Sequence, residues 1–203
     1  GKTLKDGSFS PLIEQYGIFY TNLGDIFDNL EEENSSKDLK IVAFGNPDNS
    51  LPSAEKEVKS IQTLYPQTRI FLKNDATEDK IKTLDNTFSI LHFATHGVLD
   101  YDDPRNSYLI MAKQGNTDGK FEIKELFGSP LMEHLNLVVL SACKTAVIDT
   151  KAEHHNDPVS PASAFINQGV KSVVATMWNV DDDATSILME SFYKNLKTMP
   201  LTD

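Results

Sequence analysis

The feature that most constrains the fold is the regular alternation of short apolar runs with amphipathic helical segments. The apolar runs at residues 39–44, 88–94 and 135–142 predict buried strands. Between the first two, residues 53–65 carry apolar side chains at helical spacing and predict a helix. Strands that alternate with helices indicate βαβ units and a mainly parallel sheet covered on both faces. The sequence therefore predicts an α/β fold.

The rest of the chain continues this pattern. Further strands are expected at residues 69–72, 108–112 and 171–177, and further helices at residues 77–84, 160–169 and 182–197. The last helix should bury an apolar face made of Ile187, Leu188, Phe192 and Leu196. Residues 31–38 are polar and predict a linker inside a single domain that spans residues 1–203.

Composition narrows the class of protein. The chain has 203 residues, of which 39% are apolar and 24% charged, so it can bury a sizeable core. No apolar run approaches the ~20 residues that cross a bilayer, and the first ten residues lack the apolar stretch of a signal peptide. These features lead us to expect a cytoplasmic location and no membrane partner.

The charge of the chain argues against nucleic acid as a direct partner. Lys and Arg number 19 against 30 Asp and Glu, which gives a formal net charge of −11. Such a chain repels phosphate backbones unless it carries a basic patch, and its lysines are scattered. An acidic chain attracts a basic peptide more readily.

Cys143 is the only cysteine, so no intrachain disulfide can form, which favours a reducing compartment. A single Cys with a His elsewhere in the chain is a candidate nucleophile, although a buried structural thiol is the alternative. The pair His154-His155 offers too few ligands for a metal site. Nucleotide-binding glycine motifs are absent from the sequence, so we expect neither a metal nor a cofactor.

Two buried strands end in reactive side chains. The strand at residues 88–94 runs into His96-Gly97, and the strand at residues 135–142 runs into Cys143. Sites in open α/β sheets form beyond the carboxyl ends of the strands, so neighbouring strands would place a nucleophile beside a base. The separation, 143 − 96 = 47 residues, and the Gly after the His agree with the caspase arrangement.

This pair can perform acyl transfer to a thiol. A free thiol has a pKa of about 8.5 and is mostly protonated near neutrality. An adjacent imidazole can accept its proton and later protonate the departing amine. The oxyanion that forms needs N–H donors, and the backbone amides of Gly97 and Cys143 are the candidates.

These residues lie within blocks that resemble the CHAT domain family, which is caspase-like, often joined to tetratricopeptide repeats, and distantly similar to separases. The blocks HFATHG and VVLSAC are together the most specific. The matching segments, in order, are FGNP at residues 44–47, LPSAEKEV at 51–58, DAT at 75–77, LHFATHGVLD at 91–100, residues 107–110, LVVLSACKTA at 137–146, AFINQGVKSVVATMWNVDDD at 164–183, and residues 189–196.

The resemblance implies a caspase-like three-layer α/β/α sandwich that hydrolyses peptide bonds of a protein or peptide substrate. It implies that His96 is the general acid/base and Cys143 the nucleophile, and that a regulatory tetratricopeptide-repeat or sensor region lies outside these residues. Family members usually carry more structure before Leu12 and after Leu196, so the domain is expected to be truncated at both ends. Lys144 and the glycine-poor loop at residues 147–159 depart from the family pattern, which affects specificity more than catalysis.

Three further residues are candidates for substrate binding. By its match to a separase block, Asp182 would recognise a basic residue before the cut, although capping of the next helix is the alternative. Trp178 is either core or pocket wall, and Ser141 precedes Cys143 by two positions and would line the site. His92 precedes His96 by four strand positions, about 13 Å, and is expected to be a hydrogen-bonded core residue.

Two other functions remain open at the sequence level. In one, the domain keeps a caspase-like fold only for binding a partner, without catalysis. Alternatively, it is a doubly wound domain for small-molecule binding or signalling, in which Cys143 belongs to the core. The reactivity of Cys143 toward a peptide-like electrophile separates the peptidase from both.

Overall fold

The computed structural model describes residues 2–3, 9–10, 39–100, 102–129, 132–142, 160–176 and 181–197. The chain divides into two units, residues 38–194 and residues 1–37 with 195–203. In the second unit, β1 (Lys2–Thr3) and β2 (Phe9–Ser10) form an antiparallel pair. The predicted linker at residues 31–38 lies outside the described residues, and the single domain over 1–203 stays a prediction.

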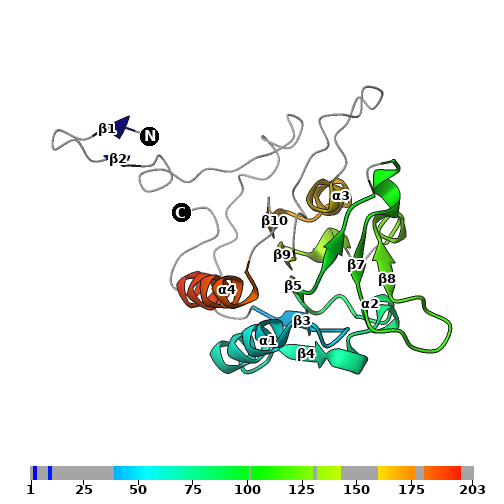
Figure 1. The fold of residues 1–203 in the computed structure, drawn as a ribbon, viewed down its shortest axis with the longest axis horizontal. Coiled ribbons are helices and arrows are strands. Elements are labelled where there is room, and N and C mark those ends of the chain that lie inside the picture. The colour runs from blue at the N-terminus through cyan, green and yellow to red at the C-terminus, as the bar shows by residue number, and fades with distance from the viewer. Residues whose placement is uncertain are drawn as a thin grey trace. The chain divides into compact units, whose positions relative to one another are not determined.

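A five-stranded parallel sheet forms the centre of the larger unit (Figure 1). The three inner strands are buried at every position, as their near-continuous apolar sequences predict. In sheet order, the strands are β10 (Ser172–Ala175), β9 (Leu137–Ser141), β5 (Ile90–Ala94), β3 (Ile41–Gly45) and β4 (Arg69–Leu72). The structure therefore confirms the α/β fold with a mainly parallel sheet.

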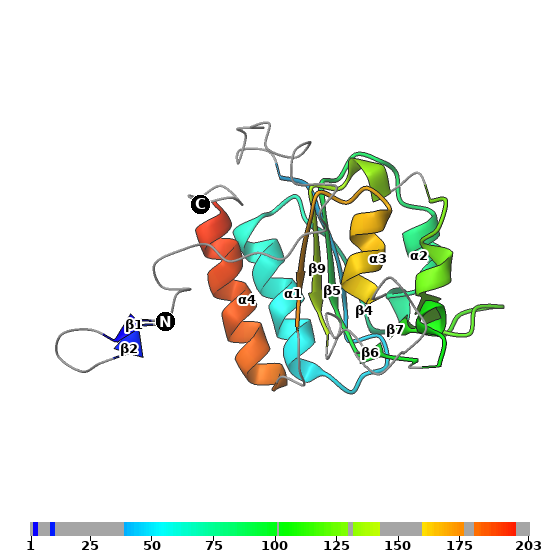
Figure 2. The same cartoon turned by 90° about the horizontal axis from the view of Figure 1, so that it is seen from above.

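Helices cover both faces of this sheet (Figure 2). α1 (Pro52–Leu64) and α4 (Asp182–Leu196) lie on one face, and α2 (Glu78–Lys82) and α3 (Pro161–Asn167) lie on the other. The three layers are consistent with a caspase-like sandwich. Short 3₁₀ helices also occur, namely η2 (Lys73–Asp75), η3 (Pro104–Asn106), η4 (Ile123–Glu125) and η5 (Met132–His134).

A second, antiparallel sheet follows the end of β5. It consists of β6 (Gly97–Val98), β7 (Tyr108–Ile110) and β8 (Lys120–Glu122), with β7 in the centre. Of its three strands, the sequence predicted only the one that begins at Tyr108. The first strand of this small sheet, β6, begins three residues after the carboxyl end of β5.

Aromatic rings fill the core on the face covered by α2 and α3. Phe93 of β5 is fully buried. Its ring centroid lies 5.5 Å from that of Phe44, 6.0 Å from that of Phe121 and 6.3 Å from that of Phe165. Phe93 thus joins the parallel sheet to β8 and α3.

The opposite face of β5 carries a buried polar network. His92 is fully buried, and its Nε2 lies 2.8 Å from Oε1 of Glu57 on α1. The two atoms are at ion-pair distance without the alignment of a hydrogen bond. Nδ1 of His92 lies 3.1 Å from the hydroxyl of Tyr193 on α4. The prediction that His92 is a hydrogen-bonded core residue is confirmed.

This network explains why the predicted inner face of α4 is wrong at Ile187 and Leu188, although Leu196 is buried as predicted. Ile187 and Leu188 are 68% and 61% exposed, whereas Thr185, Met189 and Tyr193 are buried. These three residues follow one another at four-residue spacing and define the true inner face. The apolar pattern alone favoured Ile187 and Leu188, but the Tyr193 hydroxyl pairs with a His on a distant strand, which sets the rotation of the helix.

Tyr193 is expected to make the folded protein less stable at alkaline pH. Burial raises the pKa of Tyr193 well above its ordinary value, and the charge of Glu57 raises it further. Above about pH 10 the unfolded chain loses this proton while the folded protein keeps it, so stability should fall as pH rises. Unfolding in urea at several pH values from about 9 to about 11 should show a shallower decline for Tyr193→Phe than for wild type. Equal slopes would contradict this assignment.

Gly45 at the end of β3 allows α1 to pack closely. A Cβ at this position would lie 2.8 Å from Val58 Cγ2, 3.1 Å from Leu72 Cδ2 and 3.2 Å from the Ala54 carbonyl oxygen. We expect Gly45→Ala to lower the free energy of unfolding by about 1–3 kcal/mol, the usual cost of overpacking. In a double-mutant cycle, Val58→Ala should reduce that cost because it removes the nearest atom. Strict additivity would show that the contact with Val58 is not the cause.

Candidate active site

The candidate site lies where β5 and β9 end side by side. The two strands are parallel neighbours, with Ala94 paired to Ser141, which confirms the predicted adjacency. Beyond this pair, the Thr95 N–H donates to the Ser141 carbonyl at 3.3 Å. β9 ends at Ser141, the described chain continues to Ala142, and Cys143 lies outside the described residues.

The backbone of His96 is hydrogen-bonded to β7 of the small sheet. Its carbonyl accepts a hydrogen bond from the Ile110 N–H at 2.9 Å. The neighbouring Thr95, which is buried, donates from Oγ1 to the Ile110 carbonyl at 2.7 Å. His96 therefore starts from a fixed position between the parallel sheet and β7.

The His96 side chain is 35% exposed and contacts the loop between β3 and α1. Its Nε2 lies 2.6 Å from Ser50 Oγ and 3.9 Å from Asp48 Oδ2. Ser50 Oγ donates to Asp48 Oδ1 at 2.7 Å, and the Ser50 N–H donates to the same oxygen at 3.1 Å. An acid, a hydroxyl and an imidazole thus form a continuous chain of contacts.

Asn46 fastens this loop to the end of β5. Its N–H donates to the Ala94 carbonyl at 3.0 Å, and its Oδ1 accepts from the Leu51 N–H at 2.8 Å. Asn46 is buried and has a positive φ of 51°, a conformation that Asn tolerates better than most residues. Sequence analysis missed Asp48 and Ser50, although both follow the Gly-Asn-Pro turn after a buried strand.

Gly97 presents its backbone N–H away from β7. Gly97 pairs with Leu109, and the flanking Ile110 N–H donates to the His96 carbonyl. This pattern makes Gly97 and Leu109 a non-hydrogen-bonded pair, whose amides point away from the partner strand. The orientation suits the predicted role of Gly97 as an oxyanion donor, which stays a prediction.

The three acidic residues at the start of α4 have separate partners. Asp181 Oδ1 accepts from the Ala184 N–H at 3.0 Å, so Asp181 caps α4. Asp182 Oδ2 accepts from the Ser53 N–H at 2.8 Å, in the first turn of α1. Asp183 accepts from the Ser53 hydroxyl. Ser53, the residue that Asp182 contacts, therefore lies three positions along the chain from Ser50, which contacts His96.

The other candidates for substrate binding stay predictions. Ser141 is buried at the end of β9, opposite Ala94. Trp178 lies outside the described residues. Asp182 keeps a half-buried carboxylate whose contact with Ser53 neither requires nor prevents a role toward substrate.

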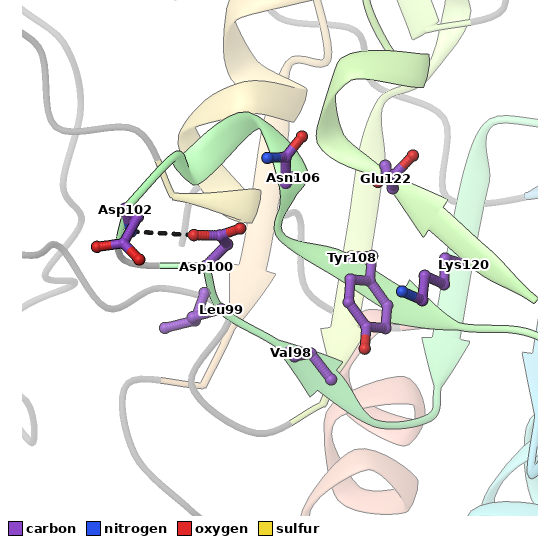
Figure 3. Close-up of a pocket in the computed structure, with 8 residues that line it drawn as sticks. All are labelled: Val98, Leu99, Asp100, Asp102, Asn106, Tyr108, Lys120 and Glu122. Atoms are coloured by element: carbon purple, nitrogen blue, oxygen red, sulfur yellow. Dashed lines mark hydrogen bonds between the residues drawn. The ribbon is translucent and has the colours of Figure 1, made fainter.

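An open hollow begins one residue after Gly97 (Figure 3). Its volume is about 640 Å³. Asp100 Oδ1 accepts from the Asp102 and Asp103 N–H groups, both at 2.9 Å, and these bonds lower the pKa of Asp100, with that from Asp103 the larger effect. The lining residues are Val98, Leu99, Asp100, Asp102, Asn106, Tyr108, Lys120 and Glu122.

The cationic group in the hollow contacts an aromatic ring. Lys120 Nζ lies 4.9 Å from the ring centroid of Tyr108, a cation–π distance.

In the part of the chain that the structure describes, no three His, Cys, Asp or Glu side chains are grouped so that they could bind a metal ion. Among the described helices, none has the length and apolar character needed to cross a membrane.

Comparison with known proteins identifies the family. The family model described as CHAT domain matches residues 2–202, which is nearly the whole chain. Among curated proteins, none matches the chain significantly. The match agrees with the parallel sheet and its flanking helices. The chain belongs to the CHAT domain family, which is caspase-like and related to peptidases.

Proposed function

We propose that the protein is a cysteine endopeptidase in which Cys143 is the nucleophile and His96 the general acid/base. The observation that carries this proposal is the register of the central sheet, in which Ala94 pairs with Ser141. His96 and Cys143 each follow these paired residues by two positions. The partly exposed imidazole of His96 and the outward-facing N–H of Gly97 support the same chemistry.

The reaction proceeds in two stages. The Cys143 sulfur bonds to the substrate carbonyl carbon while His96 accepts the thiol proton, and the Gly97 and Cys143 amides stabilise the oxyanion. Collapse of this intermediate breaks the C–N bond, and His96 gives its proton to the departing amine. Water then attacks the thioester with His96 as the base, which releases the acid and restores the thiol.

The substrate is a protein or peptide. Asp182, Trp178 and Ser141 bind the substrate residue that precedes the cleaved bond. A tetratricopeptide-repeat or sensor region outside these residues regulates the enzyme in the cytoplasm. This part of the proposal rests on the family and on the resemblance of the WNVDDD segment to separases.

The test is covalent labelling with peptidyl acyloxymethyl ketones, followed by intact mass. We expect one label per chain, none on Cys143→Ala and much slower labelling of His96→Ala. His134→Ala is the matched control, because it removes an exposed imidazole from the end of η5, away from this site. A folded wild-type chain that resists every peptide, while small thiol reagents modify Cys143, would favour a binding domain without catalysis.

Asp182→Asn tests recognition of a basic residue. The Asn oxygen can still accept from the Ser53 N–H, so the variant should remain folded. If the carboxylate binds a basic side chain, the preference for Lys or Arg ketones over neutral ones should fall on the order of tenfold, the equivalent of about 1.4 kcal/mol. The ratio of labelling rates measures this preference. An unchanged ratio would leave Asp182 with its contact to the Ser53 N–H alone.

A further inference from the structure

We propose that Ser50 and Asp48 are positioning residues that hold His96 in one tautomer, with the proton on Nε2 and the free electron pair on Nδ1. The inference rests on the proposed function, because it matters for catalysis only if His96 acts on Cys143. Its physical content, the protonation of one ring nitrogen, can be measured independently of activity.

The argument follows from the single proton of a hydroxyl group. Ser50 Oγ lies 2.7 Å from Asp48 Oδ1 and 2.6 Å from His96 Nε2. An ionised carboxylate can only accept, so the hydroxyl proton goes to Asp48. The second contact then has Ser50 as the acceptor and His96 Nε2–H as the donor. In the neutral ring, the free electron pair therefore lies on Nδ1.

The same geometry argues against Ser50 as a nucleophile. In a Ser-His-Asp triad, the carboxylate binds the ring nitrogen opposite the one that contacts the serine. Here Asp48 Oδ1 binds the serine itself, and Asp48 Oδ2 lies 3.9 Å from Nε2, the nitrogen that Ser50 already contacts. The serine proton is committed to Asp48, and the arrangement orients the imidazole instead of activating the hydroxyl.

The acid and the hydroxyl are held in place without help from His96. The Ser50 N–H donates to Asp48 Oδ1 at 3.1 Å, which closes a local turn around the carboxylate. Asn46 fixes both ends of this loop through its bonds to Ala94 and Leu51. The acceptor for Nε2–H is therefore pre-organised when substrate arrives.

Such positioning serves the proton transfers of the proposed reaction. Nδ1 accepts the thiol proton as the C–S bond forms and returns it to the amine as the C–N bond breaks, while Nε2–H stays bound to Ser50. The imidazolium formed between these steps lies close to the Asp48 charge. Without Ser50 the ring can rotate or change tautomer, and a fraction of the molecules loses the productive arrangement.

The decisive experiment is ¹⁵N–¹H NMR of the imidazole groups in the 203-residue chain, with His96 assigned from the spectrum of His96→Gln. We expect an Nε2–H signal that is protected from exchange with water in wild type, lost in Ser50→Ala and kept in Ser50→Thr, which retains the hydroxyl. Asp48→Ala should weaken the signal, because the Ser50 proton can then turn toward Nε2. A missing signal in wild type, or one unchanged in Ser50→Ala, would overturn the inference.

Labelling of Cys143 separates this inference from the proposed function. We expect Ser50→Ala to label roughly tenfold more slowly than wild type and Ser50→Thr to recover most of the rate, in the range of a lost positioning contact. An equal rate for Ser50→Ala would overturn the positioning role. A wild-type chain that never labels would refute the peptidase, while the NMR result would still decide the tautomer of His96. Ser50 is exposed, so its variants should fold.

Discussion

Replacing Glu57 by Ala is expected to lower the free energy of unfolding by about 3–5 kcal/mol, the usual cost of removing one partner from a buried ion pair. Glu57 is 2% exposed and its Oε1 lies 2.8 Å from Nε2 of the fully buried His92. Within the described residues, neither of these two atoms has an aligned hydrogen bond. The variant would leave the imidazole without its partner and open a space beneath α1.

Urea denaturation measures this loss as a lower midpoint at an unchanged slope. Two variants identify the cause. Glu57→Gln removes the charge at nearly the same volume and should cost less than Glu57→Ala. The double variant Glu57→Leu/His92→Leu replaces both partners by apolar groups and should be closer to wild type than Glu57→Ala. A loss below about 1 kcal/mol for Glu57→Ala, typical of a surface pair, would contradict the role of this contact.

Replacing Phe93 by Ala is the second large change, with an expected cost of about 3–5 kcal/mol. Phe93 is fully buried, and rings from three other elements lie within 6.3 Å of it, centroid to centroid. The truncation removes these contacts and leaves a cavity between β3, β8 and α3, which the packed sheet can close only in part.

Phe127→Ala provides the matched control, since the same side chain is 49% exposed there. It should change the free energy of unfolding by less than about 0.5 kcal/mol. Thermal unfolding of both variants next to wild type is sufficient. Similar losses for the two phenylalanines would mean that the packing around Phe93 is looser than these distances imply.

The sequence predicted the central sheet because its inner strands are almost continuously apolar. Residues 39–44, 88–94 and 135–142 are almost continuously apolar, as strands buried on both faces must be, and the structure places β3, β5 and β9 side by side. The same apolar runs located His96 beyond the end of its strand. The adjacency of β5 and β9 followed because both are long apolar strands, which belong at the centre of such a sheet.

Other features depended on contacts between distant residues. The rotation of α4 is set by Tyr193, which reaches His92 across 101 residues of chain, and no local period carries that information. Ser50 and Asp48 stand in a polar turn that reads as an ordinary loop. Their importance arises only because β3 and β5 are neighbours, so that the loop after one strand meets the His after the other.

The start of α1 has a mechanical consequence. Ser50 contacts His96, Ser53 contacts Asp182, and Glu57 contacts His92. The three residues that make these contacts all lie within residues 50–57, a continuous segment of eight residues. A small shift of α1 along its axis would therefore strain all three contacts at once. Because Ser50 lies only two residues before α1, the same shift would displace the side chain that contacts His96, the candidate general base.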